Sequence, residues 1–276
     1  MPLSISTNIA SLTAQRSFIN SNAALETAYE RLSTGKRING AGDDAAGLAI
    51  ATDLAARVSG LNQAVRNVND GISMVQIMDS TYDEVTSILQ RIRDLAVQAA
   101  NGSLTSTEKG YLESEKDQLV AAIDSALDQA RFSTQDLVGD EGSGVSMSIQ
   151  AGANTGDVIS LTISTNNAGD ASNMGVSTVH LDSDGGTTTI GAIDTALGYV
   201  ATQRATLGAH QAQLESTVRN LSNVAENTAA AAGRIMDTDY AAETANLTKA
   251  QILQQAATSV LAQANAQPQA VLSLLQ

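Results

Sequence analysis

The chain has 276 residues, a formal net charge of −14, two prolines and no cysteine. Its hydrophobic content of 43% is enough for packed cores, but only 3% of the residues are aromatic, which favours narrow helix–helix interfaces over one thick core. Without cysteine the chain cannot form disulfides or bind zinc through thiolates. Its acidity disfavours nucleic acid and anionic membrane surfaces as partners.

The sequence shows no targeting or membrane-spanning segment. The N-terminal residues, MPLSISTNIASLTAQ, have no basic start and no continuous apolar stretch, so they do not resemble a cleavable secretory signal. No apolar run is long enough to cross a bilayer. Taken alone, these features predict a cytoplasmic protein that does not insert into membranes.

The first predicted element is an amphipathic helix from residue 5 to about residue 32. Two rows of apolar side chains, spaced by three, four or seven residues, follow its length. The first row is Ile5, Ile9, Leu12, Ile19 and Ala23, and the second is Phe18, Leu25, Tyr29 and Leu32. Two apolar rows on one thin helix predict two packing partners.

A joint is predicted within residues 31–50, RLSTGKRINGAGDDAAGLAI. Three of its glycines, Gly35, Gly40 and Gly42, give the backbone freedom to bend between the two helical patterns. Asp43 or Asp44 is placed to cap the next helix by accepting a hydrogen bond from a free backbone N–H. The residues expected to form this helix–loop–helix joint are Gly35, Gly40, Gly42, Asp43 and Asp44.

The longest apolar stripe runs from about residue 44 to residue 100 and predicts one very long helix. Its first part alternates steps of four and three through Leu54, Val58, Leu61, Val65, Val68, Ile72 and Val75. A straight helix of this length would extend about 85 Å. Asn101 and Gly102 should end it. Thr105 and Glu108 then form a capping-box pair that begins another helix, folded back on the first.

Between residues 139 and 163 the apolar period changes from helical to alternating. The alternating apolar residues are Val145, Met147 and Ile149 in one run and Ile159, Leu161 and Ile163 in the next. A glycine-rich turn separates the runs, so a β-hairpin is predicted at about residues 143–165. Residues 164–191, rich in Ser, Thr, Asn, Asp and Gly, are expected to form an exposed loop with a short strand around residues 176–181.

The helical heptad pattern returns at Ile193 and continues to a second joint near Gly233 and Asp237. A last helix follows and ends in an apolar tail. Because the two chain ends mirror each other, the outer helices are expected to pair, and so are the inner ones. The predicted fold is mainly α, a long antiparallel helical bundle or coiled coil from both chain ends, with a β-hairpin and a short irregular region in the middle.

This pattern divides the chain into two predicted domains. An inner terminal-helix domain combines residues 1–43 with residues 234–276. A domain of long helices comprises residues 44–233, with the hairpin and the loop inserted in it.

The sequence offers no catalytic, cofactor-binding or metal-binding pattern. His180 and His210 have no nearby ligands in the spacing that metal or catalytic sites require. The glycine-containing strings GAGDD and GANTGD lack the Gly-Lys-Ser/Thr of a phosphate-binding loop. We therefore predict that the protein is not an enzyme and has no cofactor or metal.

Three stretches resemble one family, the bacterial flagellins. They are residues 31–50, quoted above, residues 90–103, QRIRDLAVQAANGS, and residues 234–276, RIMDTDYAAETANLTKAQILQQAATSVLAQANAQPQAVLSLLQ. The resemblance implies a short flagellin without large outer domains that polymerises into the flagellar filament and transmits motor torque for swimming. It also implies export through the flagellum's own channel without a cleaved signal peptide, and therefore an extracellular location on the bacterial flagellum.

The resemblance further implies a set of partners. These are other copies of the chain, a flagellar export chaperone, the filament cap, the hook–filament junction proteins and a host Toll-like receptor that senses flagellin. The family's contact residues for the next subunit and for this receptor map to Arg91, Leu95 and Glu115.

The apolar rows of the two terminal helices exceed what one partner helix can cover, which predicts contacts between subunits. The residues expected to form this terminal-helix assembly seam are Ile5, Ile9, Leu12, Leu247, Leu253, Val260 and Leu261.

Three alternatives stay open at the level of sequence. A hook–filament junction protein of the flagellum would share similar termini, and copy number would distinguish it from a filament subunit. A secreted enzyme on a helical scaffold is disfavoured by the missing catalytic residues. A generic coiled-coil scaffold would not explain the flagellin-like strings at both ends.

Overall fold

The computed structural model describes the chain except residues 1–7, 139–144, 164–170, 173, 182–185 and 274–276. The described helices are α1 (Ile9–Thr34), α2 (Ala45–Ala99), α3 (Ser106–Asp128), α4 (Thr187–Met236) and α5 (Tyr240–Ser273). The strands are β1 (Arg131–Phe132), β2 (Gln135–Asp136), β3 (Val145–Gln150) and β4 (Val158–Ile163). The predicted fold class, mainly helical with paired terminal helices and a central hairpin, is confirmed.

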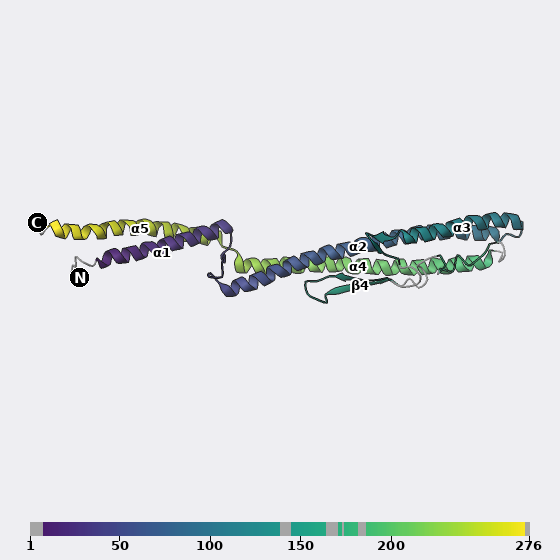
Figure 1. Cartoon of the computed structure of the whole chain (residues 1–276), viewed down its shortest axis with the longest axis horizontal. Coiled ribbons are helices and arrows are strands. Elements are labelled where there is room, and N and C mark those ends of the chain that lie inside the picture. Colours follow the sequence, from purple (N-terminus) through teal and green to yellow (C-terminus); the bar gives the residue numbers. More distant parts are fainter. Residues whose placement is uncertain (1–7, 139–144, 164–170, 173, 182–185, 274–276) are drawn as a thin grey trace. The chain divides into compact units, whose positions relative to one another are not determined.

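Contacts divide the chain into two compact units, residues 1–56 with 227–276, and residues 57–226. In the first unit α1 and α5 lie antiparallel and side by side (Figure 1). Asn8 caps the start of α1 by accepting a hydrogen bond from the Ser11 N–H at 3.1 Å. Gly35 ends α1 in the left-handed conformation, with φ 70°, which costs glycine little.

The interface between α1 and α5 is made of small side chains. Small residues permit the close approach of two helix axes but bury little apolar area. The buried residues with small side chains are Ser11, Ala14, Ser21 and Ala28 on α1 and Ala250, Ala257 and Ala264 on α5.

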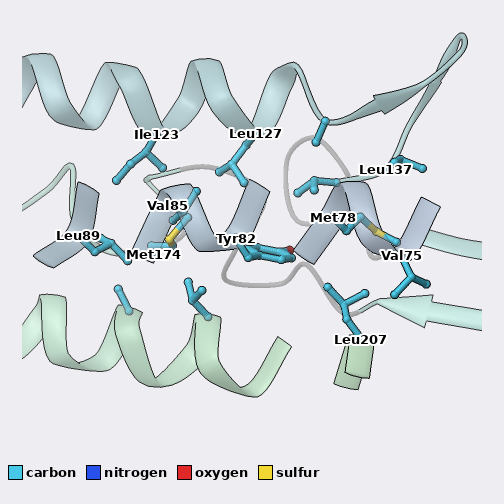
Figure 2. Packing of buried hydrophobic residues seen from close by; sticks show 14 of the residues in the cluster. Val75, Met78, Tyr82, Val85, Leu89, Ile123, Leu127, Leu137, Met174 and Leu207 are labelled. Carbon is cyan, nitrogen blue, oxygen red and sulfur yellow. The ribbon is translucent and has the colours of Figure 1, made fainter. Parts of the chain in front are cut away.

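The second unit has a conventional core of large side chains, centred on α2. Figure 2 shows Ile123 and Leu127 of α3 and Leu207 of α4 pointing toward the buried stripe of α2. That stripe repeats at steps of three and four, as an amphipathic helix requires. Its fully buried members with large side chains are Val68, Val75, Met78, Tyr82, Val85, Leu89 and Ile92. Thr105 and Glu108 form the predicted capping box at the start of α3.

The predicted hairpin forms from β3 and β4, which pair in antiparallel fashion. Antiparallel pairing places Met147 opposite Leu161 and Ile149 opposite Ile159, so apolar residues meet across the strands. Gly71 of α2 lies directly against the end of the Ile149 side chain, and a Cβ at this position would overlap it. The glycine therefore allows the hairpin to approach α2 closely.

The segment expected to be an exposed loop buries its apolar residues where the structure describes it, while Ser172, Thr178 and His180 are exposed, so this prediction was wrong for the apolar positions. Its apolar residues Ala171, Met174, Val176, Val179 and Leu181 are all buried. No strand forms at residues 176–181, and α4 already begins at residue 187. The remainder of the expected loop, residues 164–170, 173 and 182–185, lies outside the described part.

The reason for this burial is that side chains of α3 satisfy the segment's backbone, so it needs no strand partner. Asp124 accepts a hydrogen bond from the Ala171 N–H at 2.8 Å. The Lys116 ammonium donates to the carbonyl oxygen of Val179 at 2.8 Å.

Candidate functional site

The described residues contain no assembled chemical centre. No group of three or more His, Asp or Glu side chains among them is placed to hold a metal ion. None of the described helices is long and apolar enough to cross a membrane. The candidate sites are therefore the joint, the terminal helices and the predicted contact face on α2 and α3.

At the joint, the two adjacent aspartates have different roles. Asp44 caps α2, because its Oδ1 accepts a hydrogen bond from the Gly47 N–H at 2.8 Å. Asp43 closes the preceding loop, because its Oδ2 accepts from the backbone N–H groups of Asn39, at 3.0 Å, and Gly40, at 3.1 Å. These two bonds favour the carboxylate and hold the pKa of Asp43 below its ordinary value.

The joint also ties the outgoing chain to the returning chain. A β-bridge links Lys36 with Asp237. The Arg37 N–H donates to the carbonyl of Met236 at 2.6 Å, and the Thr238 N–H donates to that of Gly35 at 3.0 Å. The two predicted joints are thus one structure.

Of the three glycines predicted to form this joint, only one needs to be glycine for backbone reasons. Gly35 has a positive φ, and a Cβ there would lie 2.9 Å from the Tyr240 hydroxyl oxygen. Gly40 and Gly42 are in the loop, but neither has a positive φ.

The predicted terminal-helix seam is exposed on the isolated chain. Large apolar side chains of α1 and α5 point away from the interface that the two helices share: Ile9 is 68% exposed, Leu12 56%, Leu253 48% and Val260 55%. Leu247 and Leu261 are partly buried, and Ile5 lies outside the described residues. Ile19 and Ile252, 65% and 60% exposed, extend the same kind of surface.

Polar pairs align α1 with α5 along the small-residue interface. Each pair joins residues that are more than 200 positions apart in the chain, so together they set the alignment of the two helices. The pairs are Asn8 Nδ2 with the Ala264 carbonyl at 2.7 Å, Ser11 with Asn265 at 2.8 Å, Asn22 with Gln254 at 2.6 Å, Tyr29 with Gln251 at 3.3 Å and Arg31 with Glu243 at 3.8 Å.

The structure brings together two of the three residues predicted for the subunit and receptor contact. Arg91 of α2 donates to Glu115 Oε1 of α3 through Nη2 at 2.6 Å and Nε at 3.1 Å, with both side chains near the surface. Leu95 is only 2% exposed and belongs to the core instead. The contact role of these residues stays a prediction.

Sequence reasoning missed a buried ion pair next to this face. Lys116 is fully buried, and its Nζ contacts Glu113 Oε1 at 2.8 Å and Asp117 Oδ1 at 3.1 Å. The Leu181 N–H donates to Glu113 Oε2 at 2.7 Å, and His180 Nδ1 lies 2.9 Å from Oε1. A signal was present, because Lys116 occupies an apolar-stripe position, four residues after Leu112 and three before Leu119.

Several of these contacts determine the ionisation of Glu113. Burial raises the pKa of Glu113, but hydrogen bonds from Lys116, the Leu181 N–H and His180 outweigh it and hold the pKa below the ordinary value. The carboxylate therefore stays ionised and compensates the buried ammonium.

The fold and these surfaces define a helical protein whose two chain ends pair and leave apolar rows uncovered. The family model of the bacterial flagellin N-terminal helical region matches residues 5–142, and that of the C-terminal helical region matches residues 190–275. The chain therefore belongs to the bacterial flagellin family.

Individual relatives agree with this assignment. The flagellin of Halalkalibacterium halodurans is 43% identical over 281 residues, and the alignment covers 99% of both chains. The flagellar filament 33 kDa core protein of Treponema phagedenis is 38% identical over 288 residues, again with 99% of both chains covered.

Two solved structures resemble the fold. The crystal structure of Bacillus cereus flagellin matches with a TM-score of 0.50 and 29% identity, over 60% of this chain and 94% of that chain. A putative flagellar hook-associated protein from Vibrio parahaemolyticus matches with a TM-score of 0.59 over 71% of this chain and 100% of that chain. Its identity is 14%, so this second likeness concerns the fold alone.

Proposed function

We propose that this chain polymerises with further copies of itself into the bacterial flagellar filament, which transmits motor torque for swimming. The observation that carries the proposal is the division of side chains on α1 and α5. Small residues face the intramolecular partner, whereas Ile9, Leu12, Leu253 and Val260 are about half exposed or more. Full burial of one such side chain contributes about 1.5–3 kcal/mol, so neighbouring subunits that cover these rows would stabilise a polymer.

The full-length relatives support the filament over the hook–filament junction. One of them is named as a core protein of the flagellar filament and aligns over 99% of both chains. The hook-associated neighbour resembles this chain only in fold.

The role proposed here is structural and non-enzymatic, and the place of action is the filament outside the cell. Within the flagellin family this role entails export through the flagellar channel without a cleaved signal peptide. It also entails an export chaperone, the filament cap and the hook–filament junction proteins as partners. Family membership supports these partners.

We further propose that the paired Arg91 and Glu115 form the surface contact to the next subunit and to a host Toll-like receptor. Their guanidinium and carboxylate groups are about half exposed, at 56% and 43%. Leu95 belongs to the buried core that surrounds α2. Arg91→Ala combined with Glu115→Ala should weaken both assembly and the response of receptor-reporter cells.

Electron microscopy of the purified, salt-precipitated protein tests the main proposal. We expect long tubes from the native chain and none, or far fewer, from a Leu12→Ser and Leu253→Ser double variant. The control is Thr13→Ser, which also introduces serine on α1, at an exposed polar position next to Leu12, and this variant should assemble normally. Native protein that forms no long tubes, or a double variant that forms them equally well, would contradict the proposed function.

A further inference from the structure

The sequence contains two Asn-Gly pairs, and the structure places them in contrasting surroundings. Asn39–Gly40 lies in the joint, and Asn101–Gly102 lies in the turn between α2 and α3. Asn-Gly is the dipeptide most prone to internal attack on the asparagine side chain. Glycine has no Cβ, so its backbone nitrogen can reach the side-chain amide carbon of the preceding residue. The two sites should therefore be similar in an unfolded chain.

At Asn101 the local hydrogen bonds favour this attack. Both Asn101 and Gly102 are exposed, and the Gly102 N–H donates no hydrogen bond to any described part of the chain. The Ser103 N–H donates to Asn101 Oδ1 at 3.2 Å. A donor on this oxygen polarises the amide and stabilises the negative charge that develops there during the attack.

At Asn39 the local hydrogen bonds oppose the attack. The Gly40 N–H donates to Asp43 Oδ2 at 3.1 Å, so removal of its proton would place a second negative charge beside the carboxylate. The Asn39 side chain is itself held, because its Nδ2 donates to the carbonyl oxygen of Lys36 at 3.3 Å.

We propose that Asn101–Gly102 is a site of spontaneous deamidation in the folded protein and that Asp43 protects Asn39–Gly40 from the same reaction. A base removes the Gly102 N–H proton, the nitrogen forms a bond to Asn101 Cγ, and the Cγ–Nδ2 bond breaks as ammonia leaves with a proton. Water then opens the succinimide ring at either carbonyl and produces aspartate or isoaspartate. In total one water is consumed and one ammonia released, without any oxidant or enzyme.

The product changes the turn in two ways. A new carboxylate appears at the C-terminal end of α2, where the helix dipole disfavours negative charge. Isoaspartate also lengthens the backbone of the turn that reverses α2 into α3. Both effects are expected to accumulate with the age of the protein.

Ageing the soluble full-length protein in mildly alkaline buffer tests the proposal by peptide mapping. Trypsin separates the sites into the peptides Asp94–Lys109 and Ile38–Arg57. In the folded protein we expect aspartate and isoaspartate to form at least about tenfold faster at Asn101 than at Asn39. In denaturant the two rates should become similar. Equal rates in the folded protein, or faster conversion at Asn39, would overturn the proposal.

Two variants separate the causes at the two sites. Asp43→Ala frees the Gly40 N–H and should accelerate conversion at Asn39, with Asn101 unchanged. Gly102→Ala should slow conversion at Asn101 and leave Asn39 as it was. Continued protection of Asn39 in Asp43→Ala would refute the role of Asp43. If Asp43→Ala loses helix content, the rates in the folded and the denatured native chain still show whether the fold protects Asn39.

Discussion

The buried ammonium group of Lys116 contacts the irregular segment that follows the hairpin. Lys116 has oxygen atoms of Glu113, Asp117 and Val179 around its ammonium group. A buried charge is tolerated when its partners remain, and removing one partner is costly because the other charge stays behind. The residue therefore stabilises the unit only as part of this set.

The first prediction concerns this set. Glu113→Ala removes the carboxylate that contacts the buried Lys116 ammonium and that accepts a hydrogen bond from the Leu181 N–H. We expect the free energy of unfolding to fall by about 2–3 kcal/mol in urea titrations. Glu115→Ala, a matched change at the exposed pair with Arg91, should cost less than about 1 kcal/mol. Equal losses in the two variants would contradict the buried pairing.

The second prediction concerns pH. Because the pKa of Glu113 is lowered in the folded chain, its ionisation stabilises the fold fully above the ordinary glutamate pKa of about 4.3. That contribution disappears as the pH falls through the folded pKa. The stability difference between native protein and Glu113→Gln should thus be constant near neutral pH and shrink in acid. Chemical unfolding across this pH range measures the difference in the free energy of unfolding. A difference that grows in acid would contradict the lowered pKa of Glu113.

At the scale of elements, the hairpin depends on a glycine in the facing helix. In Gly71→Val the branched side chain would overlap Ile149, and overpacking of this kind costs about 1–3 kcal/mol. Gly198→Val is the matched control, because a Cβ at Gly198 on α4 meets open space. That control should change stability by no more than about 0.5 kcal/mol. Thermal unfolding of both variants tests the packing, and an equally mild effect at Gly71 would argue against it.

Elements with a strong period could be predicted from the sequence. The heptad stripes indicated the approximate bounds of the helices, and alternation indicated the two strands of the hairpin, because side-chain direction repeats every two residues in a strand. The apolar residues at positions 171, 174, 176, 179 and 181 follow no strict period, so nothing local indicated that they are buried. The position of this segment is decided by Lys116 and Asp124, which contact it across 47 to 63 positions of sequence.

The candidate sites were predictable to differing degrees. The joint was found because glycines and capping aspartates act locally, although the sequence could not distinguish the roles of Asp43 and Asp44. Leu95 could not be placed from sequence, because whether a helix position is exposed depends on which neighbouring helices cover it. Lys116 was missed although it occupies a position in the apolar stripe of α3, because a charged residue there can pair with partners that only the fold brings together.

At the scale of the whole molecule, different side chains of the terminal helices serve folding of the chain and its proposed assembly. Ile252→Ser removes a side chain that is 60% exposed, so the helix content of the soluble chain should not change. Because about three fifths of this residue is still exposed, its burial between subunits would contribute about 1–2 kcal/mol, and its loss should raise the critical concentration for polymerisation by roughly five- to thirtyfold. Sedimentation of polymer at graded concentrations measures this. An unchanged critical concentration would exclude Ile252 from the assembly surface.

The complementary change acts within the chain. Ala257→Leu places a large side chain in the small-residue interface, so we expect helix content and polymerisation to fall together. Circular dichroism with the same sedimentation assay distinguishes this outcome from that of Ile252→Ser. Normal helix content in Ala257→Leu would show that the interface is looser than the buried alanine indicates.

The small-residue interface has a consequence for how the two ends find their alignment. Buried positions recur every seven residues at Ala250, Ala257 and Ala264, so a slip by one repeat, about 10 Å, would again place small buried residues of one helix against small residues of the other. Apolar packing alone therefore leaves the phase of α5 against α1 ambiguous. The polar pairs remove this ambiguity. After such a slip the carboxylate of Glu243, a residue that is only 7% exposed, would face Ala24 and lose its ion pair with Arg31. The polar contacts of the interface thus determine the axial alignment of α5 against α1.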